Sequence, residues 1–352
     1  MKLRRIAAMI TATILGAAML ASSVAAEESI KIGFALKSTG SSFYKALETG
    51  VQKACDEQGY ECIILDANMD LAKEQENVET LISQKVDVLL LDAIDTLGGV
   101  ALVQSAVDAG IPAIEVDAPI DPSAAVITTV YNNNINTAYM VGQYIPQFFG
   151  DDEMISSVVL SGGKGNTGGT ERRQGMIAGI IGTRLGLSDE DAFAAAAEFD
   201  EELISTGKAI NEDAKFEIRG QAYGSWLASE GLAGMEDLLV ANPDINCLLS
   251  ENDDMALGAQ KAIQAAEKVD QIQIFCAADG QKEGYEQIME GGQYRCTGEN
   301  SPAKVGALAV SIAGEVALEG KTADDYDDVV MTPANVVTID NVEEFYDPNS
   351  DF

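Results

Sequence analysis

Short runs of apolar residues alternate with longer amphipathic stretches along most of the chain. The runs hold few polar residues, which is typical of strands buried on both faces of a parallel sheet, and the stretches have helical spacing. The predicted strands are 30–36, 60–66, 86–92, 111–117, 126–130, 155–161, 216–221, 247–249, 272–277, 294–297, 329–331 and 336–339. The predicted helices are 42–58, 71–85, 100–109, 136–149, 170–185, 226–241, 281–290 and 302–318, with another that begins at 255. The pattern predicts an α/β fold.

The alternation stops and restarts near the middle of the chain. The run 132–134, three asparagines, favours a turn and separates two strand–helix series of similar length. A chain of 352 residues is also longer than one typical core supports. We therefore expect two lobes whose strand ends face each other across a cleft.

Polar residues follow several predicted strands directly. Ligands of open α/β sheets bind beyond the carboxyl ends of the strands, so these residues form a candidate site. In the most pronounced case, 250–254, we expect Asn252 to point into the cleft and Asp253 or Asp254 to cap the next helix. The candidate contacts of this kind are Asp92, Asp117, Asn252, Asp279 and Asn300, with Arg172 near the start of a helix.

Aromatic residues follow two of the predicted strands. Trp226 is the only tryptophan, and Phe43 and Tyr44 follow the first strand. Each could belong to the core or could form a platform for the apolar face of a sugar ring. If both groups face the cleft, they could hold one ring between them.

The composition limits the chemistry of such a cleft. The chain contains no histidine, which excludes Ser-His-Asp, Cys-His and imidazole–zinc sites. The formal net charge of −35 predicts repulsion of nucleic acid and makes an acidic ligand a poor first hypothesis. Two cleft carboxylates could still form a glycosidase pair, and this alternative stays open.

A glycine-rich loop at 163–168 fits the pattern GxGxxG between a predicted strand and a predicted helix. The pattern would suggest dinucleotide binding. However, the expected strand that ends in Asp or Glu does not follow at the usual distance. A flexible loop that borders the cleft is the simpler interpretation.

Residues 1–26 are typical of a secretory signal peptide. Basic residues precede an apolar run at 6–20, and small residues at 24–26 precede the expected cleavage site. No cysteine follows the apolar run, so the lipid-anchor cysteine of many exported bacterial proteins is missing. We expect an exported protein of the periplasm or the extracellular, cell-surface space.

The cysteines allow more than one interpretation. Cys55 and Cys62 could bridge a helix end to the next strand, whereas Cys247, Cys276 and Cys296 fall in strand-like runs and are expected to be buried thiols. 

The acidic, alanine-rich segment 187–211 interrupts the second series. It predicts a solvated helical insertion. A calcium loop is the alternative, but the oxygens lack the alternating spacing and the turning glycine of that loop.

A segment of the second series carries a family resemblance. The residues Ala-Asn-Pro-Asp-Ile at 241–245, followed by Ser-Glu-Asn-Asp-Asp-Met-Ala-Leu-Gly-Ala at 250–259, resemble the NPDI…NDxMALGA segment of one family. That family is the ribose-type, type I periplasmic sugar-binding proteins, which serve ATP-binding-cassette (ABC) importers. Further similar stretches are 30–44, 111–117 and Arg172 with Gly175-Met176. The resemblance covers nearly the whole chain after residue 26.

The resemblance implies two doubly wound lobes joined by a three-crossing hinge near Asn132, Asn300 and Val329. The implied segments are 1–26 as the signal peptide, 27–132 plus 301–329 as the N-terminal lobe, and 133–300 plus 330–352 as the C-terminal lobe. The ligand would lie between Phe43 and Tyr44 on one lobe and Trp226 on the other. The implied hydrogen-bonding contacts are Asp92, Asp117, Asn132, Arg172, Asn252, Asp279 and Asn300.

Some positions depart from the family pattern. Lys37 stands where a small polar residue is usual, and we add it to the candidate ligand contacts. Ala118 stands where an arginine often follows the aspartate, and Ala278 replaces a bulkier neighbour of Asp279. The acidic segment 187–211 is longer than usual. These departures concern the identity of the ligand and not the architecture.

The expected function is that of an exported, monomeric solute-binding protein. It would capture a monosaccharide or polyol and deliver it to the membrane permease of an ABC importer, without a cofactor, a metal or a catalytic residue. The alternatives are a sugar sensor or chemoreceptor partner that uses the same cleft, a glycoside hydrolase, and a dinucleotide-dependent enzyme. Related repressors carry a DNA-binding helix-turn-helix where this chain has its signal peptide, so no nucleic acid partner is expected.

Overall fold

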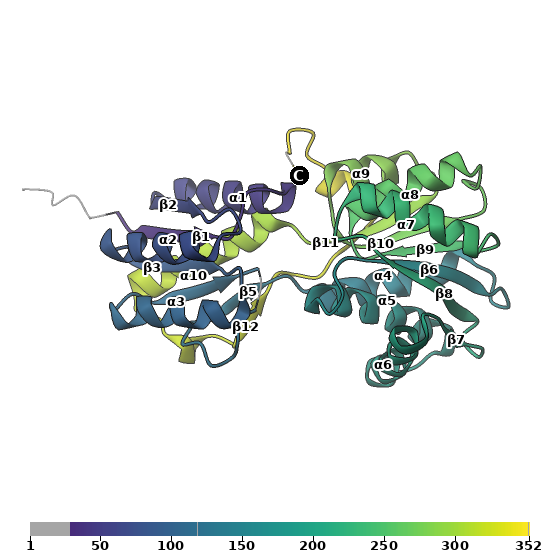
Figure 1. The fold of residues 1–352 in the computed structure, drawn as a ribbon, viewed down its shortest axis with the longest axis horizontal. Coiled ribbons are helices and arrows are strands. Elements are labelled where there is room, and N and C mark those ends of the chain that lie inside the picture. The colour runs from purple at the N-terminus through teal and green to yellow at the C-terminus, as the bar shows by residue number, and fades with distance from the viewer. Residues whose placement is uncertain (1–28, 118, 351) are drawn as a thin grey trace, which may run out of the picture.

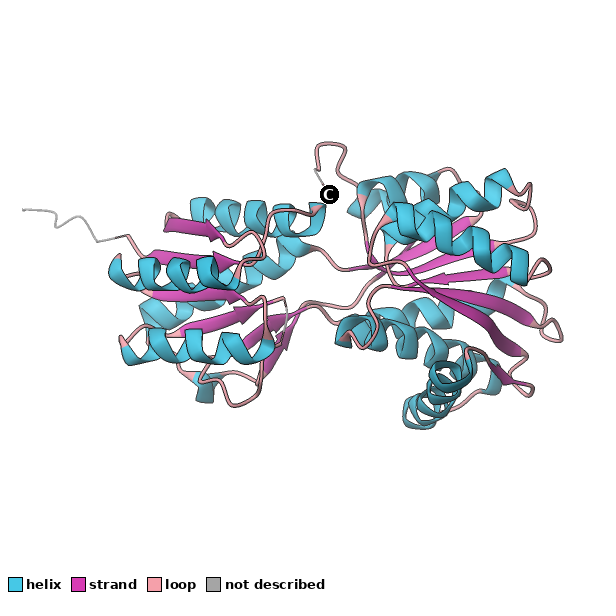
Figure 2. Cartoon of the chain, in the orientation of Figure 1, coloured by secondary structure: helices cyan, strands magenta, loops and turns pink. Residues whose placement is uncertain are grey.

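The computed structural model describes residues 29–117, 119–350 and 352, which form two α/β lobes at the two ends of the molecule (Figure 1). The predicted signal peptide, 1–26, and Ala118 lie outside the described residues. In each lobe the strands form one sheet with helices on both sides (Figure 2). No helix in the described part of the chain is both long and apolar enough to cross a membrane. The predicted α/β class and doubly wound two-lobed architecture are confirmed.

The sheet of the first lobe is parallel throughout, with the strand order β12-β5-β4-β3-β1-β2. Its strands are β1 (Lys31–Leu36), β2 (Glu61–Asp66), β3 (Val88–Asp92), β4 (Ala113–Val116), β5 (Thr129–Tyr131) and β12 (Val329–Met331). Its helices are α1 (Ser42–Gln58), α2 (Leu71–Ser83), α3 (Thr96–Asp108), α10 (Pro302–Glu319) and the short η2 (Ala323–Asp325). Because alternate strand residues point to opposite faces, Phe34 packs with α1 and α10, whereas Ala35 packs with α2 and α3.

The sheet of the second lobe has the order β13-β11-β10-β9-β6-β8-β7, and only its two edge strands are antiparallel to their neighbours. Its strands are β6 (Ile155–Ser161), β7 (Ala209–Asn211), β8 (Phe216–Tyr223), β9 (Cys247–Ser250), β10 (Gln273–Asp279), β11 (Tyr294–Glu299) and β13 (Val336–Thr338). Its helices are α4 (Asn134–Tyr144), η1 (Ile145–Phe148), α5 (Thr167–Leu185), α6 (Asp189–Thr206), α7 (Ala228–Ala241), α8 (Asp253–Ala265), α9 (Lys282–Met289) and α11 (Val342–Phe345). Leu249 packs with α4, α5 and α6, and Leu248 packs with α7, α8 and α9.

The chain crosses between the lobes after β5, after β11 and after β12. Two of the crossings are tied together, because Thr332 donates its hydroxyl to Asn132 Oδ1 (2.9 Å) and its N–H to the Tyr131 carbonyl (3.0 Å). All of β12 pairs with β5, so in the structure the last crossing follows Met331, whereas the sequence boundary was set after Val329. Among the described residues, we propose that 29–132 plus 301–331 form the first lobe and that 133–300 plus 332–352 form the second.

Among the predicted helix starts that differ from the structure, two have a clear local cause. Helix α3 begins at Thr96 and not at 100, because Asp95 caps it by accepting the N–H groups of Leu97 and Gly98. Helix α7 begins at Ala228 and not at Trp226, because Trp226 has a φ of 65°, in the left-handed region that a right-handed helix excludes.

The acidic segment 187–211 forms helix α6 and strand β7. The prediction of a solvated insertion is wrong for the inner face of α6, where Ala196, Phe199 and Leu203 belong to the core shared with α4 and α5. Ser188 caps the helix through the N–H of Asp191, and the acidic residues of its first turn suit the positive end of the helix dipole.

All five cysteines are free, so Cys55 and Cys62 do not form the bridge considered as an alternative. Cys247, Cys276 and Cys296 are buried in β9, β10 and β11, as predicted. Burial raises the pKa of these three thiols, which keeps them protonated and unreactive.

A buried carboxylate at the start of α8 joins three elements of the second lobe. Asp253 Oδ1 accepts hydrogen bonds from Tyr294 Oη (2.6 Å) and Thr297 Oγ1 (2.7 Å), both on β11. Its Oδ2 accepts the N–H groups of Gly280 (2.7 Å) and Gln281 (2.8 Å), in the turn between β10 and α9. Asp253 is fully buried, so these donors replace its water shell and hold the strand ends in place.

We predict that Asp253→Asn lowers the free energy of unfolding by roughly 3–5 kcal/mol, because the neutral amide keeps only one of the two acceptor oxygens. Its NH₂ would face either the Gly280 and Gln281 N–H groups, which cannot accept, or the Tyr294 and Thr297 hydroxyls, which would have to turn to accept. Urea unfolding followed by circular dichroism measures the change. Asp254→Asn on the same helical turn is the control and should cost less than about 1 kcal/mol. Equal losses in the two variants would contradict the joining role of Asp253.

Candidate functional site

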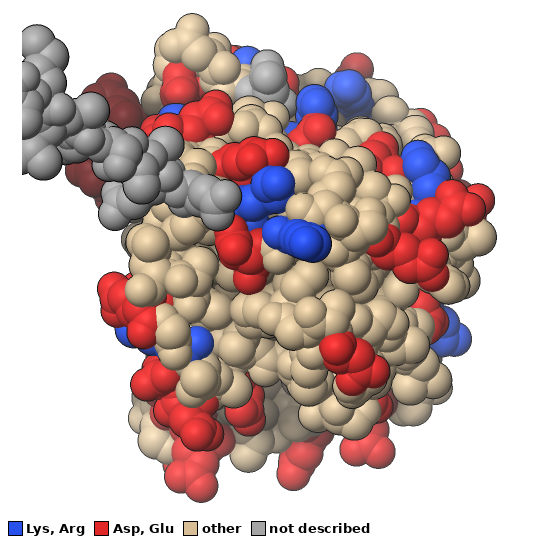
Figure 3. Space-filling model, turned by 90° about the vertical axis from the view of Figure 1, so that its left-hand side faces the viewer, with Lys and Arg blue, Asp and Glu red and all other residues tan. Residues whose placement is uncertain are grey.

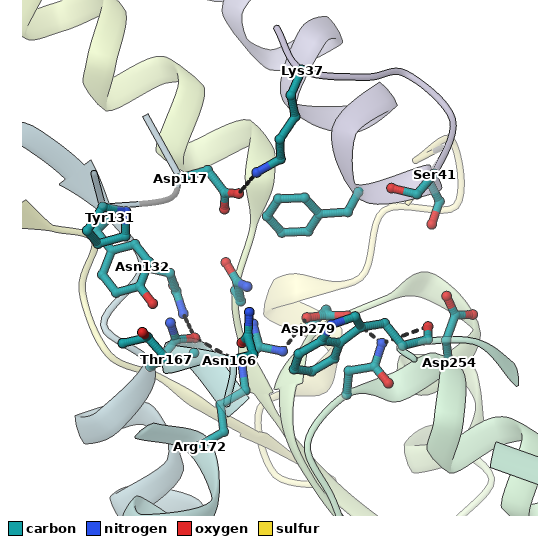
Figure 4. A pocket seen from close by; sticks show the side chains of 18 of the residues that line it. Lys37, Ser41, Asp117, Tyr131, Asn132, Asn166, Thr167, Arg172, Asp254 and Asp279 are labelled. Carbon is teal, nitrogen blue, oxygen red and sulfur yellow. Dashed lines mark hydrogen bonds and ion pairs between the residues drawn. The ribbon is translucent and has the colours of Figure 1, made fainter. Parts of the chain in front are cut away.

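A cavity of about 310 Å³ lies between the lobes, at the carboxyl ends of strands from both sheets (Figure 4). The first lobe contributes Lys37, Ser41, Ser42, Phe43, Thr96, Asp117, Pro119, Tyr131 and Asn132. The second lobe contributes Asn134, Asn166, Thr167, Gly168, Arg172, Trp226, Asn252, Asp254, Asp279, Gln281 and Asn300. The volume suits a small ligand, and most of the lining residues have polar side chains.

The first lobe places a lysine between two carboxylates. Lys37 follows β1, and its Nζ lies 2.7 Å from Asp92 Oδ1 and 3.3 Å from Asp117 Oδ2. Burial would lower the pKa of Lys37, but the facing carboxylates outweigh burial and raise it well above its usual value. Lys37 and Asp117 line the cavity, whereas Asp92 is fully buried behind them and is not a lining residue. Asp92 therefore positions and neutralises Lys37 instead of offering a ligand contact.

The first turn of α1 presents one aromatic ring to the cavity. Phe43 lines the cavity, and Tyr44 meets it edge to face with the ring centroids 5.4 Å apart. Tyr44 does not line the cavity, because consecutive helical residues point in different directions. Its ring lies 4.6 Å from Lys37 Nζ, so it supports the lysine as a cation–π partner.

Trp226 forms the aromatic wall of the second lobe. Its indole lies flat against Gly162, since a Cβ on that glycine would lie only 2.1 Å from Trp226 Cε2. The Arg172 guanidinium carbon is 5.3 Å from the centroid of the indole ring. Asn252 Nδ2 donates to the Trp226 carbonyl at 3.3 Å and so helps to hold the left-handed backbone of this residue.

Arg172 and Asp279 form a buried ion pair beside the indole, with Nη1 and Oδ1 3.3 Å apart. Arg172 also donates Nε to Asn134 Oδ1 (3.0 Å) and Nη1 to the Glu251 carbonyl (3.0 Å). Burial raises the pKa of Asp279 to about 7, although the Arg172 charge opposes this effect. The carboxylate therefore changes its charge near neutral pH.

The division of roles predicted at 250–254 is wrong in one respect. Asn252 lines the cavity, but it is also the residue that caps α8, because its Oδ1 accepts the N–H of Met255 at 3.1 Å. Asp253 is the buried joining residue, and Asp254 lines the cavity. The amide of Asn252 can do both because its Nδ2 remains available to Asp279 Oδ2, 3.4 Å away.

Two asparagines of the crossings complete the lining. Asn132 Nδ2 donates to Asn134 Oδ1 at 3.1 Å, and Asn300 is buried at the end of β11. Within the described part of the chain, no group donates to Asn300 Oδ1. A buried acceptor without a partner is costly, so this oxygen is suited to a donor supplied by a ligand.

Most of the lining residues that the sequence did not predict lie beyond the strand ends, and Tyr131 is the last residue of β5. They belong to helix caps and first turns, such as Ser41, Thr96 and Gln281, or to the glycine-rich loop, such as Asn166. The loop pattern is the available signal in the sequence, and it predicts only a loop at the border of the cleft. Nothing in the sequence distinguishes the other residues from ordinary turn residues.

The geometry of the loop does not favour the dinucleotide alternative. Asn166 Oδ1 accepts the N–H of Gly169 at 2.9 Å, so the start of α5 is already capped. The Glu251 carboxylate lies beneath the same turn, with Oε2 2.6 Å from the position of a Cβ on Gly169. A negative charge at this end of the helix opposes a pyrophosphate.

Comparison with known proteins gives one consistent family. Residues 32–322 match the family model of the periplasmic binding protein domain. The ribose import binding protein of Salmonella typhimurium is 26% identical over 316 residues, which cover 90% of this chain and 93% of that protein. The ribose import binding protein of Bacillus subtilis is 28% identical over 290 residues, which cover 82% of each chain.

A solved structure gives the same result. An ABC transporter solute-binding protein from Mycobacterium smegmatis, with bound glycerol, matches with a TM-score of 0.71 and 26% identity, and covers 92% of this chain and 98% of that one. The family match spans most of the chain, and the two lobes with a cavity between them are the architecture that the sequence resemblance implied. The chain therefore belongs to the periplasmic binding protein family.

Proposed function

We propose that this protein is an exported solute-binding protein that captures a neutral monosaccharide or polyol between its lobes. The observation that carries the proposal is that aromatic walls from opposite lobes, Phe43 and Trp226, line one cavity together with polar groups from both. Aromatic rings pack on the apolar face of a sugar, and charged or amide groups bond its hydroxyls.

The polar groups of the cavity match vicinal hydroxyls. Asp117 and Asp279 can accept hydrogen bonds, Lys37 and Arg172 can donate them, and Asn300 can do both. Each cation already faces carboxylates, so the cavity has no surplus positive charge for an anion. The acidic surface, visible on the end of the first lobe in Figure 3, also disfavours an anionic ligand.

The names of the relatives support the same ligand class. Two of them import ribose, and the M. smegmatis structure holds glycerol. We propose that this chain acts as a monomer, delivers its ligand to the membrane permease of an ABC importer, and catalyses no reaction. Export by the predicted signal peptide would place it in the periplasm or at the cell surface.

A thermal-shift screen of the protein against sugars, polyols and nucleosides is the first test. We expect at least one sugar or polyol to raise the melting temperature, because a ligand that binds only the folded form stabilises it. Calorimetry should then show saturable binding with one site and no product. Turnover of a sugar or glycoside by the pure protein would contradict the proposal.

We predict that Trp226→Ala and Asp279→Ala each weaken ligand binding by at least about 1–3 kcal/mol, because a buried platform or a charged hydrogen bond is lost. Titration calorimetry measures the change. Tyr223→Ala is the matched control, since this exposed aromatic residue ends β8, the strand that Trp226 follows, and does not line the cavity. Unchanged affinity in both cavity variants would rule out the proposed site.

The raised pKa of Asp279, about 7, predicts a pH dependence of binding. Above this pH the carboxylate is ionised and both oxygens accept hydroxyl hydrogen bonds, whereas below it one oxygen carries a proton and the negative charge is lost. We expect the affinity for a neutral ligand to fall by up to about tenfold from pH 8 to pH 6. Asp279→Asn should bind more weakly and should show a much flatter profile; an unaltered profile in that variant would assign the titration to another group.

A further inference from the structure

Helix α6 takes no part in the lining of the cavity, yet one of its side chains points into the second lobe. In Figure 1 the helix lies beside α5 at the lower edge of that lobe. Its residue Asp200 is only 4% exposed, although the segment is strongly acidic and most of its carboxylates face solvent. A buried carboxylate needs a partner, and the partner of Asp200 belongs to a series of contacts that reaches the cavity.

Asp200 and an arginine of α5 form a two-pronged ion pair. Arg173 donates Nε to Asp200 Oδ1 (2.5 Å) and Nη2 to Oδ2 (3.1 Å), and Gln174 Nε2 also donates to Oδ2 (3.1 Å). The remaining nitrogen of Arg173, Nη1, donates to Glu251 Oε1 at 2.9 Å. The guanidinium orientation is thus fixed from both sides.

Glu251 connects the fixed guanidinium of Arg173 to the residues that support the indole of Trp226. Its Oε2 accepts the N–H of Gly162 at 2.8 Å, and Gly162 is the residue against which the ring lies. The same oxygen lies against Gly169, and Trp226 Cη2 is 3.3 Å from the position of a Cβ on that glycine. The carboxylate that holds the Gly162 backbone therefore also packs against Gly169, the second glycine beside the ring.

Burial makes the three charges act as a unit. Glu251 is fully buried and Arg173 is 5% exposed, so neither charge can turn to solvent when its partner is lost. Burial raises the pKa of Glu251, and the Arg173 charge opposes that effect. Moving Arg173 would therefore also weaken the hold of Glu251 on the Gly162 backbone.

We propose that α6 is a positioning element of the cavity and that Asp200 is a positioning residue, which acts through Arg173 and Glu251 on the support of Trp226. The expected effect of Asp200 on ligand affinity rests on the proposed function. The expected effect on the position of the indole does not, because the contacts are present without a ligand. The long acidic segment then has a role beyond the solvated insertion that its composition suggested.

The single tryptophan of the chain makes the proposal testable without a ligand. In Asp200→Asn we expect the Trp226 emission to shift to longer wavelength and acrylamide to quench it more strongly. Gly162→Ala displaces the ring directly and is the positive control. Glu201→Gln, which changes an exposed carboxylate on the same helix, is the matched control and should leave both readings unchanged.

A second variant covers the case in which Asp200→Asn does not fold. Arg173→Lys keeps the charge but loses the two-pronged geometry, and it should move the Trp226 signal in the same direction. Far-UV circular dichroism checks the fold of each variant. If a folded Asp200→Asn or Arg173→Lys protein shows the emission and quenching of the wild type, the proposal is overturned. If the melting temperature of such a variant is lower while these readings are unchanged, the role of the residue is purely structural.

Ligand affinity is the second reading. With D-ribose as the probe, we expect Asp200→Asn to weaken binding roughly two- to thirtyfold, the range that residues acting through others usually give, while Glu201→Gln binds like the wild type. If D-ribose does not bind the wild type, D-ribose is not the ligand of this cavity, and the fluorescence readings still decide the positioning role. If it binds both variants equally while the emission of Asp200→Asn is unchanged, the proposal is wrong.

Discussion

The second half of the cavity depends on the burial of a single carboxylate, Asp253. A fully buried charge must be surrounded by donors, and here the donors come from β11 and from the turn after β10. Satisfying Asp253 therefore fixes the relative positions of three strand-end segments. Asp279 and Asn300 lie on those segments, and Asn252 is the adjacent residue. The geometry of these lining residues follows from the need to solvate one buried group.

The same rule governs the charges that line the cavity itself. Lys37 is held between Asp92 and Asp117 in the first lobe, and Arg172 is held by Asp279 and the Glu251 carbonyl in the second. Each of these two cations is thus paired with groups of its own lobe. A ligand then meets side chains that are already oriented, so less ordering cost opposes binding when the lobes close on it.

Much of the fold was predictable because it depends on local patterns. Buried parallel strands need continuous apolar runs, and their lengths match the observed strands closely at β1 and β6. Helix starts were less predictable, since a cap such as Asp95 or a left-handed residue such as Trp226 overrides the periodicity. For the site, the strand-end rule brought most candidates to one cavity, but it could not separate Asp117, which lines it, from Asp92, which lies behind Lys37.

The sequence by itself determined the class of fold, the two-lobed plan, the family and the strand ends at which a cavity had to lie, because these follow from periodicity and from short motifs. The tertiary structure alone decided which charge faces which partner, that Tyr44 supports Lys37 instead of a ligand, and that α6 reaches Trp226 through Asp200, Arg173 and Glu251. The reason is that these interactions act over a few ångströms between residues far apart in the chain, and burial makes them strong. A linear pattern carries no record of such distances.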